Sequence, residues 1–445
     1  MKKYTVFSYL FFYGALLLAQ VQADKVERFT LKNGMKIMVL EDHSIPNANM
    51  YLFWKVGSRN EYPGITGLSH FFEHMMFNGS KKYGPKMFDR TMEAAGGSNN
   101  AYTTENITVY TDWFPTSSLE TIFDLEADRI GHLALDSAMV ESERGVVLSE
   151  RSTGLENSNF RNISEAVKAA AFFAHPYRWS VIGYESDIKN WTQNDLQTYF
   201  DTYYAPNNAV TVISGDVDLD KVKELAKSYF EPIPAQPAPR KVHTVEPPQM
   251  GERRVMVHKI VSTPNVMVAY HVPETAHGDH YALELLNAIL TNGKSSRLYN
   301  GLVNDQQLAT SVMSYMPESF DPNLLYIFAV ANGEITADRL EKGILAELER
   351  IKQDGIPERE LQKVKNQKLV AFYKDLETID GKSNTLGTYE LFFGDYKKMY
   401  GAPEAYSKVT ADDIVRVAKT YLTQWNRTIG VLQDNGTVET DLQKL

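Results

Sequence analysis

The chain has 445 residues, a formal net charge of −10 at pH 7 and no cysteine. The lack of cysteine excludes a disulfide framework and thiol chemistry, and the acidic balance without a basic stripe argues against a nucleic-acid partner. A chain of this length can form two substantial hydrophobic cores.

The start of the chain is typical of a signal peptide. Lys2 and Lys3 give a short positive start, residues 6–18 are mostly apolar, and small residues precede a predicted cleavage after Ala23. Because the apolar run is short for a membrane span, we expect no stable span after cleavage, with an uncleaved anchor as the alternative. The sequon Asn78-Gly79-Ser80 abuts the motif described below, which favours a bacterial periplasm over a eukaryotic secretory pathway.

Strand-like and helical segments follow each other without the strict alternation of βαβ units. The sequence therefore predicts an α+β fold with mainly antiparallel sheets packed with helices. Strands are expected at residues 35–40, 50–56, 107–113 and 255–260, and helices at residues 119–134, 220–230, 281–290 and 335–353.

The segment His70-Phe71-Phe72-Glu73-His74 carries the clearest chemical signal. Residues four apart share one helical face, so both imidazoles can bind one ion, and Glu73 is close enough to polarise a water on it. Thr66 or Ser69 could cap the start of this helix, which we expect to be buried. The alternative is a pair of core histidines, which would leave a costly buried carboxylate without a metal.

A catalytic zinc ion takes three protein ligands, so a third ligand is expected on another element. Glu143 and Glu150 lie seven residues apart on one face of a predicted helix at residues 140–151, with Val146 and Val147 expected on its buried side. One carboxylate could bind the ion while the other holds a histidine. The alternative is a solvated helix with neighbouring Glu–Arg pairs.

A proline-rich stretch divides the chain after the signal peptide at residues 1–23. We expect an N-terminal zinc-binding domain at residues 24–235, a linker at residues 236–249 and a C-terminal domain without a zinc motif at residues 250–445. The halves share a pattern: Thr192–Leu196 matches Thr410–Ile414, and the same shift pairs Tyr203 with Tyr421, Asn208 with Asn426 and Asp216 with Asp434. The repeat predicts two copies of one fold.

Taken together, these motifs resemble the M16 (pitrilysin) family of zinc peptidases. The family pattern joins the His-x-x-Glu-His motif to a distal glutamate, here Glu150. Further segments follow in the same order along essentially the whole chain after the signal peptide: Leu31–Gly34, Gly96-Gly97, Asn100–Thr103, His175–Tyr177, Tyr203–Asn208 and Gly215-Asp216.

The resemblance implies one Zn²⁺ per chain, held by His70, His74 and Glu150. Glu73 is then the expected general base of a metalloendopeptidase, and Glu143 the carboxylate that supports the ligands from behind.

The resemblance also implies that peptide substrates bind as an added β-strand along Asn100, Ala101 and Tyr102. Backbone pairing of this kind tolerates many peptide sequences. The alternative for Asn100 is a local role in turn chemistry.

One part of the family pattern is missing. Where active two-domain members have an Arg and, seven residues on, a Tyr that stabilise the oxyanion, this chain has Val303 and Thr310. In the short-chain, M16B-like branch two chains pair, so we expect a dimer, and in particular a heterodimer with a homologous chain that supplies the Arg/Tyr pair. The alternatives are a peptide-binding or assembly subunit with little turnover, and another zinc hydrolase such as an amidase.

Overall fold

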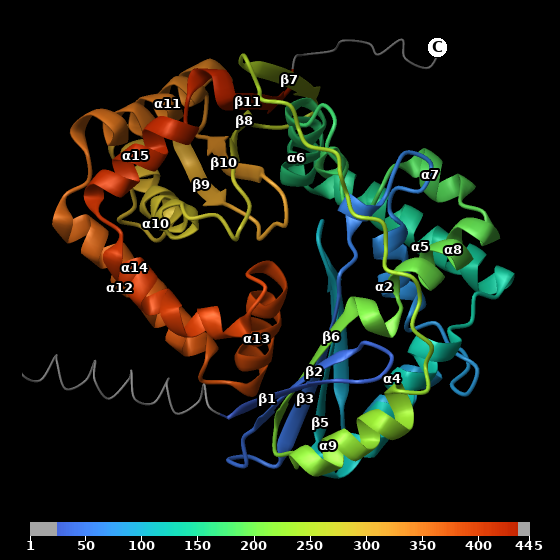
Figure 1. Cartoon of the computed structure of the whole chain (residues 1–445). Helices are drawn as coiled ribbons and strands as arrows, with labels where there is room; N and C mark the ends of the chain where they lie inside the picture. Colours follow the sequence, from blue (N-terminus) through green and yellow to red (C-terminus); the bar gives the residue numbers. More distant parts are fainter. Residues whose placement is uncertain (1–24, 435–445) are drawn as a thin grey trace, which may run out of the picture. The chain divides into compact units, whose positions relative to one another are not determined.

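The computed structural model describes residues 25–434 (Figure 1), so the predicted signal peptide lies outside the described residues. Close packing divides the chain into two units. Unit 1 comprises Met1–Val147, Val181–Val242 and Val370–Glu404, and unit 2 comprises Leu148–Ser180, His243–Leu369 and Ala405–Leu445. Each unit is a sheet packed with helices, which confirms the predicted α+β fold.

The sheet of unit 1 has six strands in the order β1-β2-β6-β3-β5-β4. Its neighbouring strands are antiparallel except for β2 and β6, which are parallel. The inner strand β3 is buried almost throughout, whereas the edge strand β4 alternates between exposed and half-buried residues. The bounds are β1 (Val26–Thr30), β2 (Lys36–Glu41), β3 (Asn47–Trp54), β4 (Ser98–Thr103), β5 (Thr108–Pro115) and β6 (Ala209–Gly215).

Helices cover both faces of this sheet. On one face, the Tyr110 hydroxyl of β5 donates to the carbonyl of Phe72 in α2 at 3.0 Å. On the other, Trp113 Nε1 donates to Asp380 Oδ1 of α13 at 2.8 Å. Because side chains alternate between the two faces of a strand, Tyr110 and the other even-numbered residues of β5 face the side of α2, and Trp113 and the other odd-numbered residues face the side of α13. The helices of unit 1 are α2 (Leu68–Met75), α3 (Met87–Ala94), α4 (Leu119–His132), α7 (Glu185–Asn190), α8 (Gln193–Tyr203), α9 (Leu219–Leu225) and α13 (Ile379–Phe392).

The sheet of unit 2 repeats this topology with five strands in the order β7-β11-β8-β10-β9. Here β7 and β11 are parallel, as β2 and β6 are in unit 1, and the other neighbouring strands are antiparallel. The sheets therefore agree strand for strand apart from β1, as the predicted duplication requires. The strands are β7 (Arg253–His258), β8 (Asn265–Val272), β9 (Ala309–Tyr315), β10 (Asn323–Ala331) and β11 (Arg427–Gln433), and the helices are α6 (Asn159–Ala171), α10 (His280–Thr291), α11 (Ala337–Asp354) and α15 (Ala411–Tyr421). Two further helices, α12 (Glu358–Asp375) and α14 (Ala402–Lys408), include residues of both units.

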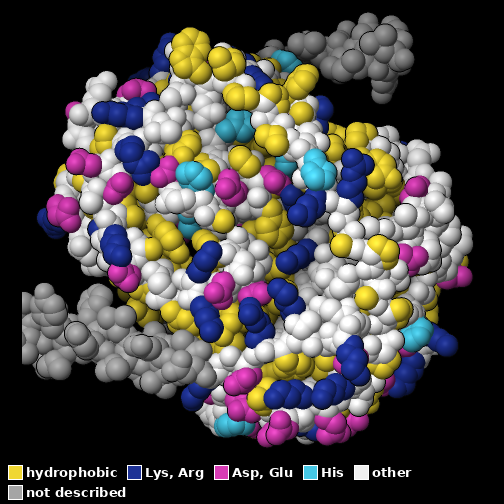
Figure 2. Space-filling model, viewed as in Figure 1, with side chains coloured by type: hydrophobic (Ala, Val, Ile, Leu, Met, Phe, Trp, Pro, Cys, Tyr) yellow, Lys and Arg dark blue, Asp and Glu magenta, His cyan; other side chains and the backbone are white. Residues whose placement is uncertain are grey.

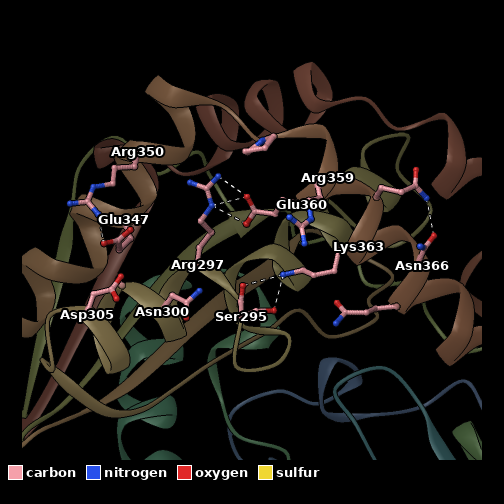
Figure 3. Close-up of a pocket in the computed structure, with 14 residues that line it drawn as sticks. Ser295, Arg297, Asn300, Asp305, Glu347, Arg350, Arg359, Glu360, Lys363 and Asn366 are labelled. Carbon is pink, nitrogen blue, oxygen red and sulfur yellow. Dashed lines mark hydrogen bonds and ion pairs between the residues drawn. The ribbon is translucent and has the colours of Figure 1, made fainter.

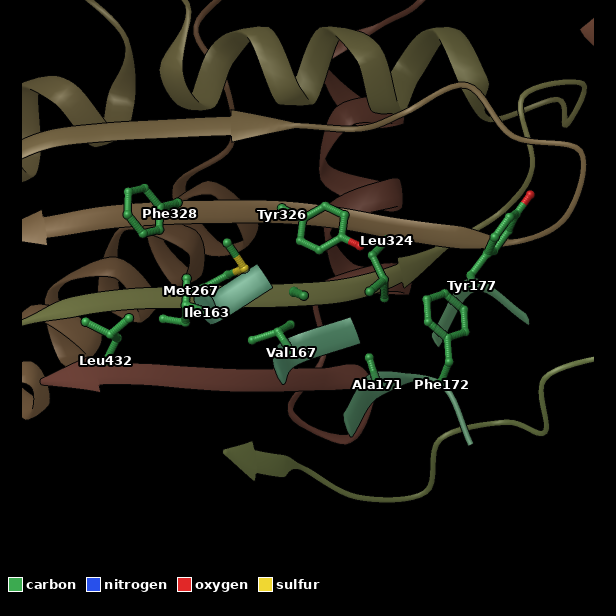
Figure 4. Close-up of a cluster of buried hydrophobic side chains, with 11 residues drawn as sticks. Ile163, Val167, Ala171, Phe172, Tyr177, Met267, Leu324, Tyr326, Phe328 and Leu432 are labelled. Carbon is green, nitrogen blue, oxygen red and sulfur yellow. The ribbon is translucent and has the colours of Figure 1, made fainter. Parts of the chain in front are cut away.

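The core of unit 2 forms where α6 packs on its sheet (Figure 4). Ile163 and Val167 of α6 are fully buried against Met267 and Leu432 of the strands. Gly430 allows this close approach, since a Cβ there would lie 2.4 Å from Val167 Cγ2. The helix therefore needs a small residue in β11 directly beneath it.

Two helices pack on the sheet of the other half of the sequence. α6 precedes the linker yet belongs to unit 2, and α13 follows the linker yet belongs to unit 1, where Ser383 Oγ donates to Asn49 Oδ1 at 2.7 Å. Sequence periodicity shows which face of a helix is apolar but not which sheet covers it, so this exchange was not predicted. The linker itself has neither helix nor strand at residues 236–249.

The surface and the helices also bear on the expected partners. Acidic and basic side chains are intermixed on the face in Figure 2. Within residues 25–434, no helix has both the length and the apolar composition needed to cross a bilayer. The expected lack of a nucleic-acid partner stays a prediction.

Candidate active site

The motif helix α2 starts in a way the sequence did not reveal. Neither Thr66 nor Ser69 caps it: the N-cap is Gly67, with φ at 92° and no side-chain bond. Instead the buried carboxylate of Glu61 accepts hydrogen bonds from the backbone N–H of Gly67 at 2.7 Å and of Ser69 at 2.8 Å. Burial raises the pKa of Glu61 to about 8. Glu61 thus satisfies donors that a helix start leaves unpaired.

Apolar contacts fix the rotation of α2. Phe71 packs against Trp191 with ring centroids 5.0 Å apart, and Phe72 against Tyr204 at 5.3 Å. These aromatic residues are buried, whereas His70, Glu73 and His74 are half-buried. The i, i+4 spacing thus turns the three polar residues toward one accessible face.

The predicted ligands converge. His70, His74 and Glu150 each offer one ligand atom, and these atoms all lie within 4.8 Å of one another. Glu150 lies on α5 (Ser137–Asn157), a single continuous helix. Two imidazole nitrogens and one carboxylate are a donor set that catalytic zinc uses, and with bonds of about 2.0–2.2 Å a small side-chain adjustment closes them on one ion. The residues therefore fit zinc.

Glu143 supports this group from behind. Its Oε1 accepts a hydrogen bond from His74 Nδ1 at 2.8 Å, and its Oε2 accepts one from Asn78 Nδ2 at 2.6 Å. The His74 bond holds the pKa of Glu143 below its ordinary value. With Nδ1 engaged, Nε2 of His74 is the nitrogen that would face an ion.

The alternative for α5 was a solvated helix in which Glu143 pairs with Arg144 and Glu150 with Arg151, and the structure gives both arginines other partners. Arg144 pairs with Glu141 at 3.1 Å, and Arg151 pairs with Glu165 at 2.6 Å. The expectation for the buried side was half wrong: Val147 is buried, but Val146 is 48% exposed. Consecutive helical residues point about 100° apart, so the apolar face of α5 includes only one of the two valines.

The edge strand β4 lies beside Glu73. Thr103 Oγ1 at the end of β4 donates to Glu73 Oε2 at 2.5 Å. Asn100 and Tyr102 are exposed and Ala101 is half-buried. The Asn100 side chain accepts from the N–H of Ala101 at 2.9 Å, the local contact that its alternative role predicts. Among the described strands none pairs along the outer side of β4, so its backbone is placed to accept another strand.

Comparison with known proteins accounts for nearly the whole chain. Residues 36–183 match the family model described as Insulinase (Peptidase family M16), and residues 190–368 match the one described as Peptidase M16 inactive domain. A protein named Zinc protease PqqE from Helicobacter pylori is 33% identical over 420 residues, covering 92% of this chain and 93% of that protein. The chain belongs to the M16 peptidase family.

Two further similarities extend this result. The crystal structure of a protease from Helicobacter pylori superposes with a TM-score of 0.88 at 33% identity, covering 92% of this chain and 99% of that one. A protein named Mitochondrial-processing peptidase subunit beta, from Lentinula edodes, is 24% identical over 436 residues, covering 94% of this chain and 93% of that protein. The M16 fold is thus matched over about nine-tenths of the chain.

The second half of this M16 chain has other residues where the oxyanion pair was sought. Val303 lies in a π-helix (Tyr299–Asp305), and Thr310 lies on β9. The nearby Arg297 forms a bidentate contact with Glu360, Nη2 to Oε2 at 2.7 Å. Its guanidinium is therefore already engaged by a carboxylate of the same unit.

A polar cavity of about 1100 Å³ lies in unit 2 and includes Arg297 and Glu360 (Figure 3). Several of its charged groups have partners within the cavity: Arg350 donates to Glu347 at 2.7 Å, and Lys363 donates to the Ser295 hydroxyl at 3.1 Å. None of the predicted site residues lines this cavity.

Sequence reasoning also missed a buried charged cluster beneath the M16 motif helix. Arg129 Nε donates to Glu126 Oε2 at 2.8 Å, and its guanidinium lies 4.6 Å from the ring centroid of Tyr110, whose hydroxyl bonds α2. Burial and the Glu126 charge raise the pKa of Asp112 well above its ordinary value. The signal in the sequence was weak, because Glu126 and Arg129 lie three residues apart in a helix that also carries Glu120, Asp124 and Asp128.

Proposed function

We propose that this chain is a zinc-dependent endopeptidase that cleaves peptides bound as an added strand on β4. The observation that carries the proposal is the convergence of His70, His74 and Glu150 beside a glutamate that contacts the edge strand. The names of relatives, zinc protease among them, support a peptidase that uses zinc.

Zinc bound by this group would polarise the scissile carbonyl and lower the pKa of the attacking water. Glu73 takes the proton of that water and later gives it to the leaving amine. Glu143 holds the ring of His74 in one orientation.

Peptide binding is assigned to β4. The backbone of Asn100, Ala101 and Tyr102 pairs with the peptide, so binding depends weakly on peptide sequence. The exposed side chains of Asn100 and Tyr102 add contacts at one side, although the Tyr102 hydroxyl already donates to Asn384 Oδ1 at 3.2 Å. This mode requires an extended peptide segment.

The lack of an Arg/Tyr pair in this chain suggests that a second chain supplies it. Val303 has no side-chain donor, and the short Thr310 side chain donates to the Val330 carbonyl at 3.4 Å, so neither replaces the Arg/Tyr pair; one relative is named as a subunit. We therefore propose a dimer, in particular a heterodimer with a homologous chain that supplies the pair. The same absence favours the second candidate function, a peptide-binding or assembly subunit with little turnover. We further propose export to a bacterial periplasm through the N-terminal segment.

Zinc content and peptide cleavage test the enzyme proposal. The full chain, assayed alone and with any co-purified homologue, should contain one zinc per chain and cleave an internally quenched unstructured peptide. Glu73→Gln should keep the zinc and lower turnover by about 10²–10⁴-fold, because it removes the base but no ligand. Glu93→Gln, an exposed residue of α3, is the matched control and should cleave normally.

Each other outcome contradicts part of the proposal. Peptide binding with no turnover, unaffected by Glu73→Gln even with a homologue present, identifies the binding-subunit alternative. Full turnover by the purified chain as a homodimer rules out the requirement for a different partner chain. A chain that cleaves small amides but no peptides is an amidase instead.

A further inference from the structure

Thr103 joins the strand that would bind the peptide to the residue that would move the proton. It is the last residue of β4, and its side chain points to the face of the sheet that α2 covers. Its hydroxyl donates to Glu73 Oε2 at 2.5 Å, a close and direct contact between the edge strand and the motif helix. The terminal torsion of a glutamate is broad, so one strong hydrogen bond restricts the carboxylate considerably.

The backbone around Thr103 is held independently of this bond. The next residue, Thr104, closes the β4–β5 turn by donating its N–H to the Ile107 carbonyl at 2.8 Å. The N–H of Arg59 donates to the Glu105 carbonyl at 2.9 Å, which ties the turn to residues 57–61. Gly57 permits this contact, since a Cβ there would lie 2.5 Å from the Thr104 carbonyl oxygen.

The same short segment also holds α2. Residue Glu61, directly after this contact, accepts the N–H groups of Gly67 and Ser69 at the start of the helix. One segment of the chain thus sets the positions of both β4 and α2. The hydroxyl of Thr103 and the carboxylate of Glu73 are brought together by backbone contacts and do not rely on their own bond for placement.

We propose that Thr103 is a positioning residue that orients the Glu73 carboxylate from the substrate-binding strand. This rests on the proposed function of Glu73. The peptide pairs with the backbone of β4 and the base is held by a side chain of the same strand, so the strand sets the distance between base and scissile bond. Loss of the hydroxyl should therefore affect turnover and leave peptide binding unchanged, because backbone pairing does not use it.

The first test compares Thr103→Val with Thr103→Ser. Valine keeps the β-branched shape and removes the hydroxyl, whereas serine keeps the hydroxyl. In Thr103→Val kcat should fall about tenfold to a hundredfold with KM and zinc content unchanged, and Thr103→Ser should recover most of the loss. Thr211→Val, a buried threonine of β6, is the matched control and should keep wild-type kcat.

A second test does not require turnover. In the zinc-free full chain, Thr103→Val should lower the urea midpoint of unfolding, and this shift should largely disappear in a Glu73→Ala background, because the bond is then already absent. An equal shift of the urea midpoint in both backgrounds would show that Thr103 and Glu73 do not form this hydrogen bond. Unchanged kcat in Thr103→Val, or equal losses in the valine and serine variants, overturns the positioning role. If the wild-type chain cleaves nothing even with a homologous partner chain present, the proposed function fails and the unfolding cycle alone decides whether the bond exists.

Discussion

Helices α2 and α10 stand at matching places in two sheets of the same strand order, yet they carry different chemistry. α2 follows β3 and α10 follows β8, and an Asn-Gly pair comes after each, Asn78-Gly79 and Asn292-Gly293. Counting back from these pairs, the place of His70 is taken in unit 2 by Glu284. The places of Glu73 and His74 are taken by Asn287 and Ala288.

Unit 2 has an ion pair at this place. Lys368 Nζ of α12 donates to Glu284 Oε1 at 3.0 Å, and the Tyr406 hydroxyl donates to the other oxygen. Burial raises the pKa of Glu284, but the Lys368 and His280 charges and the Tyr406 hydroxyl outweigh it, so the pKa lies below its ordinary value. One scaffold thus supports a set of metal ligands in one copy and an internally neutralised pair in the other. The difference lies in a few side chains and not in the fold.

Zinc stoichiometry tests most directly whether the metal site belongs to α2 and not to α10. His70→Ala should lose the bound zinc and all zinc-dependent cleavage, because two remaining ligands are too few for a catalytic site. Glu284→Gln in unit 2 should leave the zinc content at one per chain. Atomic absorption on the purified proteins measures both.

His132→Ala, an exposed histidine beside Asp128, is the control for loss of an imidazole elsewhere in unit 1. Full zinc retention in His70→Ala, or zinc loss in Glu284→Gln, would contradict the assignment of the site to α2.

Glu143 bonds His74, a predicted zinc ligand, so its removal should weaken zinc binding. Glu143→Ala should weaken zinc binding by about 10–100-fold, since His74 loses the group that orients its ring. Competition with a chromophoric chelator measures the affinity. Glu141→Ala, on the exposed side of the same helix, should bind zinc like the wild type; an equal loss there would show that the effect comes from α5 as a whole.

The ion pair of unit 2 should contribute to stability and not to the zinc site. Lys368→Met leaves Glu284 without its cation and should lower the free energy of unfolding by about 2 kcal/mol, with the zinc content unchanged. Urea unfolding measures this effect, and Lys374→Met on the same helix, at an exposed position, should change it little. A variant that loses zinc would show that the two places are coupled.

The sequence predicted the local part of the site and missed the tertiary part. His70, Glu73 and His74 could be placed because a helix brings residues four apart onto one face whatever surrounds it. Glu150 required the family resemblance, because spacing along α5 offered Glu143 equally. The contact between Thr103 and Glu73 depends on how β4 packs beside α2, and no sequence period encodes that.

The fold shows the same limit. The mixed architecture and its antiparallel sheets followed from segment order, but the exchange of α6 and α13 between the halves did not. Val146 was expected on the buried side of α5 and is exposed. Two adjacent valines point in different directions on a helix, and the sequence does not show which of them faces the core. Glu61 was missed because its partners are the backbone N–H groups of Gly67 and Ser69, which it reaches only through the turn that ends at Gly67.

Substitution of Glu61 gives the smallest expected change in zinc binding and tests the start of α2 separately from its ligands. The ordinary pKa of 4.5 is raised to about 8 in the folded chain, so between these values the folded state holds a proton that the unfolded state has lost. The stability of the wild type should therefore decline as pH rises from about 4.5 to about 8 and then level off. Glu61→Gln mimics the neutral form, so it should flatten this decline while costing about 1 kcal/mol or less through weaker capping. Urea midpoints of the zinc-free chain across this pH range measure the slope; an unchanged slope in the variant would assign the pH dependence to other groups, and α2 would then start on a carboxylate that stays charged.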